Sequence, residues 1–162
     1  MIFVAMPCGI MTMFYSEDII GADNGWVLLV FAFILIWVND IFAYLTGSAI
    51  GRHKLCPRIS PKKTIEGSVG GAVFTMLIAY LVNRFVLNVY FFDSFMTDIE
   101  VLFLALGVVI FGTLGDLSES MMKRHAGVKD SGSVIPGHGG ILDRFDATFM
   151  AIPFVFIYLL LI

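Results

Sequence analysis

Long apolar segments alternate with short polar segments along the chain. Two of the apolar segments, residues 25–50 and 68–92, are longer than the roughly 20 residues that a helix needs to cross a bilayer. A third covers residues 101–117, and the last, residues 147–162, would form a helix of about 24 Å at a rise of about 1.5 Å per residue. Residues 1–15 are apolar but short. The pattern predicts an all-α, polytopic membrane helical bundle with about five transmembrane segments.

The composition agrees with a membrane protein and excludes an ordinary soluble globular protein. Hydrophobic residues make up 59% of the 162 residues and charged residues 14%, whereas soluble domains carry about 25% charged residues. We therefore expect a single membrane-embedded catalytic domain, residues 1–162, in contact with the lipid bilayer. We expect no nucleic acid among its partners.

The charged residues are segregated between the loops. Nine of the ten basic residues lie in residues 51–67 and 118–146, whereas residues 16–24 and 91–100 carry only acids. Because positive charge favours the cytoplasmic side of a membrane, this pattern predicts two cytoplasmic polar loops that converge on one face. We expect an integral membrane protein, in the cytoplasmic (inner) membrane if the source is bacterial, with its active site on the cytoplasmic face.

The first candidate site residues lie where the apolar segment of residues 101–117 becomes polar. Asp116, Glu119, Ser120 and Lys123 are spaced by three, four and seven residues, so one face of a helix carries them all. An acid at membrane depth needs a partner, water or a cation. The alternative is a solvated helix end with local ion pairs, and it stays open, above all for Glu119.

Two more acids, Asp143 and Asp146, stand three residues apart before the last apolar segment. Helix capping is one interpretation, because acids complement the amino end of a helix. The other combines them with Asp116 as three carboxylates from two helix ends that hold one or two hard cations. We expect Mg²⁺, which favours carboxylates together with phosphate oxygens, and leave a second cation such as K⁺ as an alternative.

A glycine-rich run and several basic residues could bind phosphate. Backbone N–H groups in such a run can point at an anion, and Lys and Arg pair with phosphate oxygens. Alternatively, the basic residues only set the orientation of the chain in the membrane and attract lipid headgroups. The candidate substrate-binding residues in this stretch are Arg124, Lys129, His138, Gly139, Gly140 and Arg144, with Lys123 as a further phosphate contact.

The earlier polar segment adds a second set of candidates. Ser60 and Pro61 resemble a helix cap followed by a first-turn proline. Lys62 and Lys63 would then lie near a helix start, where anions are favoured. Asp40 lies inside the apolar segment of residues 25–50, where a buried acid indicates function. A structural polar contact is the alternative.

The polar segment of residues 118–146 also resembles a known family signature. The match to the CDP-diacylglycerol synthase (phosphatidate cytidylyltransferase) family runs through Ser120-x-x-Lys123-Arg124, Lys129-Asp130 and Pro136-x-His138-Gly139-Gly140-x-x-Asp143-Arg144-x-Asp146. The upstream motifs NDIFAY and SPKKTIEG resemble the same family. The resemblance covers roughly residue 37 to the carboxyl end. Family members usually have a larger amino-terminal membrane half, which we expect to be missing here.

The resemblance implies that CTP and phosphatidic acid react to give CDP-diacylglycerol and pyrophosphate in the presence of Mg²⁺. It places Asp116, Asp143 and Asp146 at the metal. It also implies that Ser120 and Lys123, helped by Lys62 and Lys63, contact phosphates. A homodimer is the expected assembly.

Other functions stay open at this point. The chain could be another CTP-dependent lipid enzyme or a fragment that needs a second chain for activity. A transporter or channel subunit would explain the apolar segments and Asp40, but not a cluster of acids, bases and glycines at one face.

Overall fold

The fold is a bundle of long apolar helices, and the computed structural model describes residues 2–15, 25–91, 96–128, 140 and 142–162. The helices are α1 (Ile2–Met13), α3 (Gly25–Ile50), α4 (Ile65–Val82) with its π-helical continuation η1 (Asn83–Phe91), α5 (Asp98–His125), α6 (Leu142–Phe145) and α7 (Thr148–Leu161). Within the described ranges, four helical segments are long and apolar enough to cross a membrane: residues 25–50, 65–91, 98–125 and 142–161. The predicted all-α membrane bundle is confirmed.

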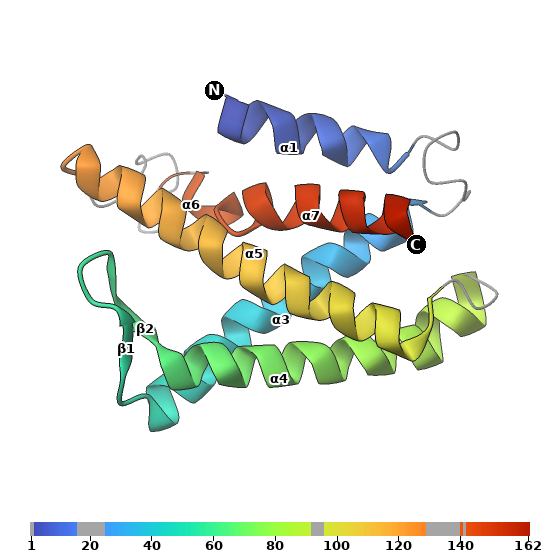
Figure 1. Ribbon diagram of the computed structural model, residues 1–162, viewed down its shortest axis with the longest axis horizontal. Coiled ribbons are helices and arrows are strands. Elements are labelled where there is room, and N and C mark those ends of the chain that lie inside the picture. Colours follow the sequence, from blue (N-terminus) through green and yellow to red (C-terminus); the bar gives the residue numbers. More distant parts are fainter. Residues whose placement is uncertain (1, 16–24, 92–95, 129–139, 141) are drawn as a thin grey trace.

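The expected fifth segment forms α1, which has 12 residues. That is shorter than the roughly 20 residues that a spanning helix needs. It lies along α7 at the edge of the bundle (Figure 1).

The core lies where α3, α5 and α7 meet. Leu35, Ala105 and Ile152, one from each helix, are completely buried. Phe154 of α7 stacks on Phe111 of α5 with ring centroids 4.7 Å apart. Its ring also covers Gly107, where a side chain would collide with it. Apolar contacts of this kind hold α5 and α7 side by side and fix the position of the polar residues at the end of α5.

Glycines allow α3 and α4 to pack closely. A methyl group at Gly67 of α4 would lie 2.6 Å from the carbonyl oxygen of Ala43 and 3.1 Å from the Cα of Gly47 on α3. Small residues permit this approach of two helix backbones inside a membrane. Phe42 and Phe74 stack across the same pair of helices, with ring centroids 4.2 Å apart. The paired helices form one wall of the polar end.

The predicted helix start at Ser60 and Pro61 is wrong. Residues Lys54–Cys56 (β1) and Ser60–Thr64 (β2) form an antiparallel hairpin, and α4 begins only at Ile65. The N-cap is Thr64, whose hydroxyl oxygen accepts a hydrogen bond of 3.2 Å from the N–H of Gly67. Proline is tolerated in this hairpin because a two-stranded ribbon consists of edge strands.

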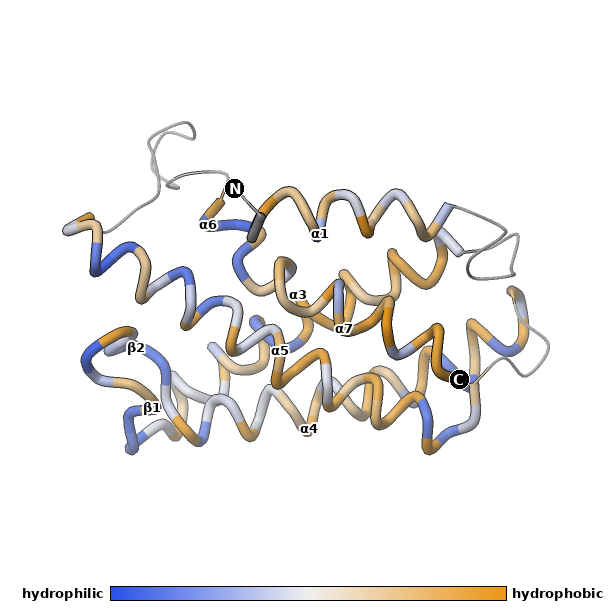
Figure 2. Tube along the Cα trace, turned by 45° about the horizontal axis from the view of Figure 1, so that its top comes forward, coloured by the Kyte–Doolittle hydropathy of each residue, from blue (hydrophilic) through white to orange (hydrophobic). Residues whose placement is uncertain are grey.

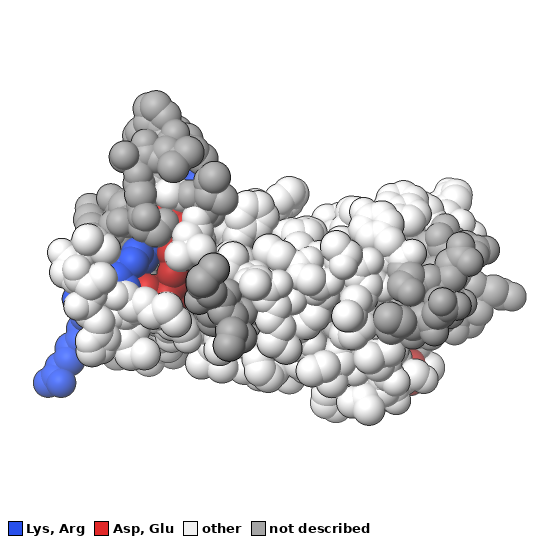
Figure 3. Space-filling model, turned by 90° about the horizontal axis from the view of Figure 1, so that it is seen from above, with Lys and Arg blue, Asp and Glu red and all other residues white. Residues whose placement is uncertain are grey.

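The polar residues gather at one end of the bundle. The hydrophilic parts of the trace are the hairpin, the last turns of α5 and the region of α6, whereas the remainder is mostly hydrophobic (Figure 2). The space-filling view shows basic and acidic side chains together at this end, beside a broad uncharged surface (Figure 3). The two basic segments therefore meet in space, as the charge pattern predicts.

Candidate functional site

A cavity of about 610 Å³ opens at the polar end between α3, the hairpin, α4 and α5. Its walls combine an α3 face, the lysines of the hairpin and the polar turn of α5. The lining residues used below are Asn39, Asp40, Lys62, Lys63, Thr113 and Asp116. The volume falls within the range of about 300–1,000 Å³ that is typical of small-molecule sites. The cavity is therefore large enough for an organic substrate.

An ion pair joins the hairpin to α5 across this cavity. Lys63 contacts the Asp116 carboxylate, and both side chains are about one-quarter exposed. The Ser120 hydroxyl donates a 3.2 Å hydrogen bond to the same carboxylate, because it lies one helical turn further along α5. Asp40 of α3 lies within electrostatic range of both Lys63 and Asp116. Residues from three elements thus face one another here.

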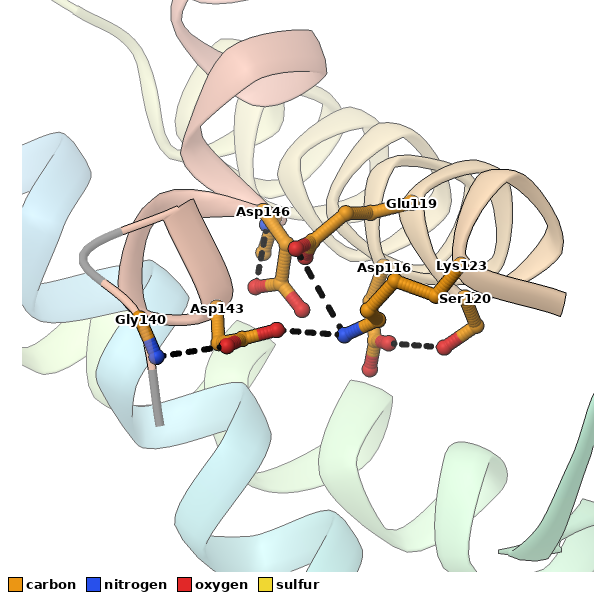
Figure 4. Close-up of polar contacts among 8 residues, drawn as sticks. Asp116, Glu119, Ser120, Lys123, Gly140, Asp143 and Asp146 are labelled. Atoms are coloured by element: carbon orange, nitrogen blue, oxygen red, sulfur yellow. Dashed lines mark hydrogen bonds and ion pairs between the residues drawn. The ribbon is translucent and has the colours of Figure 1, made fainter. Parts of the chain in front are cut away.

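A second ion pair joins α5 to α6. The Lys123 ammonium lies 2.7 Å from one carboxylate oxygen of Asp143 and 3.5 Å from a carboxylate oxygen of Glu119 (Figure 4). The other oxygen of Asp143 accepts a 2.8 Å hydrogen bond from the backbone N–H of Gly140. Three side chains and one backbone group therefore form a continuous polar chain from the end of α5 to the start of α6.

Asp146 approaches α5 because of a glycine. A methyl group at Gly115 would lie 2.5 Å from the carbonyl oxygen of Asp146, so a side chain there would force the segments apart. The Asp146 carboxylate accepts a 2.7 Å hydrogen bond from the N–H of Ala147. It lies beside Glu119 and within electrostatic range of Asp116 (Figure 4). Ala147 is the N-cap residue of α7 and makes no side-chain cap.

The predicted site residues fall into three groups. The structure brings together Asp40, Lys62, Lys63, Asp116, Ser120, Lys123, Gly140, Asp143 and Asp146 at the polar end. Arg124 and Arg144 are exposed side chains at the same end. The remaining candidates, Lys129, His138 and Gly139, lie outside the described residues.

Glu119 is a candidate from the helix-face spacing to which the family resemblance assigns no role. The solvated helix end, its alternative interpretation, is wrong because the side chain is only 1% exposed, whereas the local ion pair is present, with Lys123 3.5 Å away. The spacing with Asp116 and Lys123 signals that the three share a helix face. Its burial and its neighbour Asp146, 27 residues further along the sequence, give no local signal.

The site has the donor atoms for a hard cation but no preformed metal cluster. Among the residues that the structure describes, no three His, Cys, Asp or Glu side chains are gathered so that they could hold a metal ion. Five acids gather at this end, namely Asp40, Asp116, Glu119, Asp143 and Asp146. Carboxylate oxygens suit Mg²⁺ in their chemistry.

Comparisons with known proteins agree with this arrangement. A model of the cytidylyltransferase family matches residues 1–162. The chain is 46% identical over 152 residues to phosphatidate cytidylyltransferase of Staphylococcus aureus (strain COL), covering 94% of this chain and 55% of that protein. It is 44% identical over 139 residues to the Staphylococcus haemolyticus (strain JCSC1435) protein of the same name, covering 85% and 51%.

The chain therefore spans about half the length of these curated relatives. Its match to the family model nevertheless covers every residue, including both polar segments and the helices that carry them. The chain belongs to the cytidylyltransferase family.

Proposed function

We propose that this chain carries the active site of a phosphatidate cytidylyltransferase, which transfers CMP from CTP to phosphatidic acid and gives CDP-diacylglycerol and pyrophosphate. The observation that carries the proposal is the meeting of lysines and acids at one end of an apolar bundle. Those of α3, the hairpin and α5 line one cavity, and an ion pair between α5 and α6 lies at the same end. A lipid headgroup could reach such a site from the bilayer, and a nucleotide could reach it from water. The names of the relatives support the choice of substrates.

The reaction is a substitution at the α-phosphorus of CTP. An oxygen of the lipid phosphate forms a bond to this phosphorus, and the bond to the bridging oxygen of the β-phosphate breaks. That oxygen keeps the electron pair and leaves as part of pyrophosphate. A phosphate monoester has a second pKa of about 6 and is largely dianionic at pH 7, so the attack needs no strong base from the protein.

The basic residues supply charge that complements the phosphates. Lys62 and Lys63 reach the cavity from the hairpin, and Lys123 lies at the same polar end of α5, where it pairs with Asp143. Lysine acts as a point charge that stabilises transferring phosphoryl groups. Ser120 adds a hydroxyl beside Asp116. The remaining substrate contacts that we propose are Asp40, Arg124, Lys129, His138, Gly139, Gly140 and Arg144.

Asp116, Asp143 and Asp146 are the proposed ligands of Mg²⁺, with K⁺ as the alternative for a second ion. The gathering of carboxylates at the polar end supports this assignment. When bound, Mg²⁺ would neutralise phosphate charge and orient the leaving group.

We further propose that the polar end faces the cytoplasm and that the protein forms a homodimer. The five basic residues of residues 51–67 and the four of residues 118–146 support the orientation, because such residues favour the cytoplasmic side.

The proposal is tested with purified protein in detergent. CTP, phosphatidic acid and Mg²⁺ should yield CDP-diacylglycerol, and the Asp143→Asn variant should not. A folded protein that forms no CDP-diacylglycerol under these conditions would count against the proposal.

A further inference from the structure

Glu119 is a buried acid for which the proposed reaction gives no role. Its side chain is 1% exposed, and within the described part of the chain neither carboxylate oxygen accepts a hydrogen bond. A buried carboxylate is costly unless a charge or hydrogen-bond donor compensates it. Such a residue therefore requires a partner that explains its position.

The partner that the geometry offers is Lys123, one helical turn further along α5. The Lys123 ammonium lies 3.5 Å from Glu119, and the lysine side chain is itself 17% exposed. Asp146, which lies beside Glu119, can compensate it only when the two carboxyl groups share a proton, because two carboxylate anions repel each other. It increases the negative charge around Glu119 and so strengthens the attraction of Lys123.

Lys123 is held from two sides. Its ammonium also lies 2.7 Å from Asp143, whose second oxygen is fixed by the Gly140 N–H at 2.8 Å. A lysine has a flexible four-carbon stem and three donors, so a single partner leaves much of its freedom. Two carboxylates, one from α5 and one from α6, define a single position for the charge (Figure 4).

We infer that Glu119 is a positioning residue that holds the Lys123 ammonium group at the place where it meets a substrate phosphate. The inference rests on the proposed function, in which Lys123 contacts phosphate. Glu119 touches no substrate in this account and acts through Lys123. Its carboxylate keeps the ammonium beside Asp143, ready for the charge that develops in the transition state.

A double-mutant cycle tests this inference with the whole chain. The variants are Glu119→Gln, Lys123→Met and the double substitution, each assayed for CTP turnover with phosphatidic acid and Mg²⁺. Glu119→Gln should lower kcat by about tenfold, within the range of couplings between contacting residues, with a smaller change in KM for CTP. In the Lys123→Met background the same change should have less than about a twofold effect. Equal effects in both backgrounds, or none in either, would overturn the inference.

Thermal stability separates positioning from a structural role. Removing one partner of a buried ion pair is destabilising when it leaves the other charge uncompensated. In Glu119→Gln the Lys123 ammonium keeps its ion pair with Asp143, so the unfolding midpoint should not fall while kcat does. A lower midpoint with unchanged kcat in the folded fraction would contradict the inference. Glu119→Asp keeps the charge and should retain more activity than Glu119→Gln.

Glu100→Gln is the matched control. Glu100 lies on the same helix, and its side chain completes a capping box with Thr97. Glutamine also serves at this position of a capping box, so the control should keep both its kcat and its unfolding midpoint.

A chemical readout distinguishes failure of this inference from failure of the proposed function. Mass spectrometry measures how fast an amine-reactive acylating reagent modifies Lys123 in folded protein without nucleotide. Loss of the Glu119 pair should raise this rate by about twofold or more, whereas Glu100→Gln should leave it unchanged. If Lys123 is modified faster in Glu119→Gln but the unsubstituted chain forms no CDP-diacylglycerol, only the proposed function is refuted. If the chain is active and Glu119→Gln leaves the rate of Lys123 modification unchanged, only the inference is refuted.

Discussion

Lys63 on the hairpin pairs with Asp116 on α5 across the cavity, and this contact links the first polar segment of the chain to the helix that leads into the second. Between these residues the chain passes through α4, η1 and most of α5. The pair therefore depends on the packing of the whole bundle. It places a cation and an anion where the proposed reaction needs both.

Lys63→Met should lower CTP turnover by roughly tenfold or more, because one charge that stabilises the transferring phosphoryl group is lost. Steady-state assays over a range of CTP concentrations measure the loss. The control is Arg58→Gln, which removes a positive charge from the exposed turn of the same hairpin. If both variants lose the same activity, general attraction of anions explains the lysine, and its specific role is refuted.

Gly115→Ala should destabilise the protein and reduce turnover. The added methyl group would lie 2.5 Å from the carbonyl oxygen of Asp146, so α5 must move away from the start of α7. Overpacking of this kind typically costs about 1–3 kcal/mol, which a lower unfolding midpoint in detergent would reveal.

Gly9→Ala is the control for this substitution. No atom lies within 4 Å of a methyl group at Gly9 in α1, and alanine favours a helix over glycine by up to about 1 kcal/mol. Its unfolding midpoint should stay the same or rise. An unchanged midpoint for Gly115→Ala would contradict the close packing of the two segments.

Thr64→Val should destabilise the junction between the hairpin and α4. The threonine hydroxyl oxygen accepts the hydrogen bond from the Gly67 N–H, and loss of such a cap costs about 1 kcal/mol. Thr64→Ser keeps the hydroxyl and should retain most of the stability. The unfolding midpoints of the two variants measure the difference. Equal loss in both would show that the threonine acts through its methyl group instead.

The orientation in the membrane can be tested with single cysteines. After Cys8 and Cys56 are replaced by serine, Arg58→Cys reports on the hairpin and Asp98→Cys on the opposite end of α5. A membrane-impermeant thiol reagent should label Asp98→Cys on intact cells and Arg58→Cys only after permeabilisation, because basic segments favour the cytoplasm. The reverse pattern would refute the proposed cytoplasmic site.

The apolar segments could be predicted from the sequence because a spanning helix has a length and composition that local residues determine. The same applies to Asp116, Ser120 and Lys123, whose spacing alone places them on one helix face. The meeting of residues 51–67 with residues 118–146 could be predicted from charge, and Lys63 lies within electrostatic range of Asp146, which agrees with it.

The hairpin and the role of Glu119 could not be predicted in this way. Ser60 and Pro61 fit a helix start locally, but tertiary contacts place the cap at Thr64. His53 makes two contacts at this junction. Its carbonyl oxygen accepts a 2.9 Å hydrogen bond from the Ile65 N–H, and its ring Nδ1 lies 2.6 Å from a carboxylate oxygen of Glu66. Glu119 likewise lies beside Asp146, a neighbour that the local sequence of α5 does not reveal.

The central claim is that the residues gathered at the polar end join CTP to a lipid phosphate. The most direct measurement follows labelled CTP in the presence of phosphatidic acid and Mg²⁺, with purified chain in detergent. The account predicts CDP-diacylglycerol and an equal amount of pyrophosphate, with product absent for Asp143→Asn and after chelation of Mg²⁺. CDP-diacylglycerol formed at the same rate by Asp143→Asn, or no product from folded wild-type protein, would contradict it.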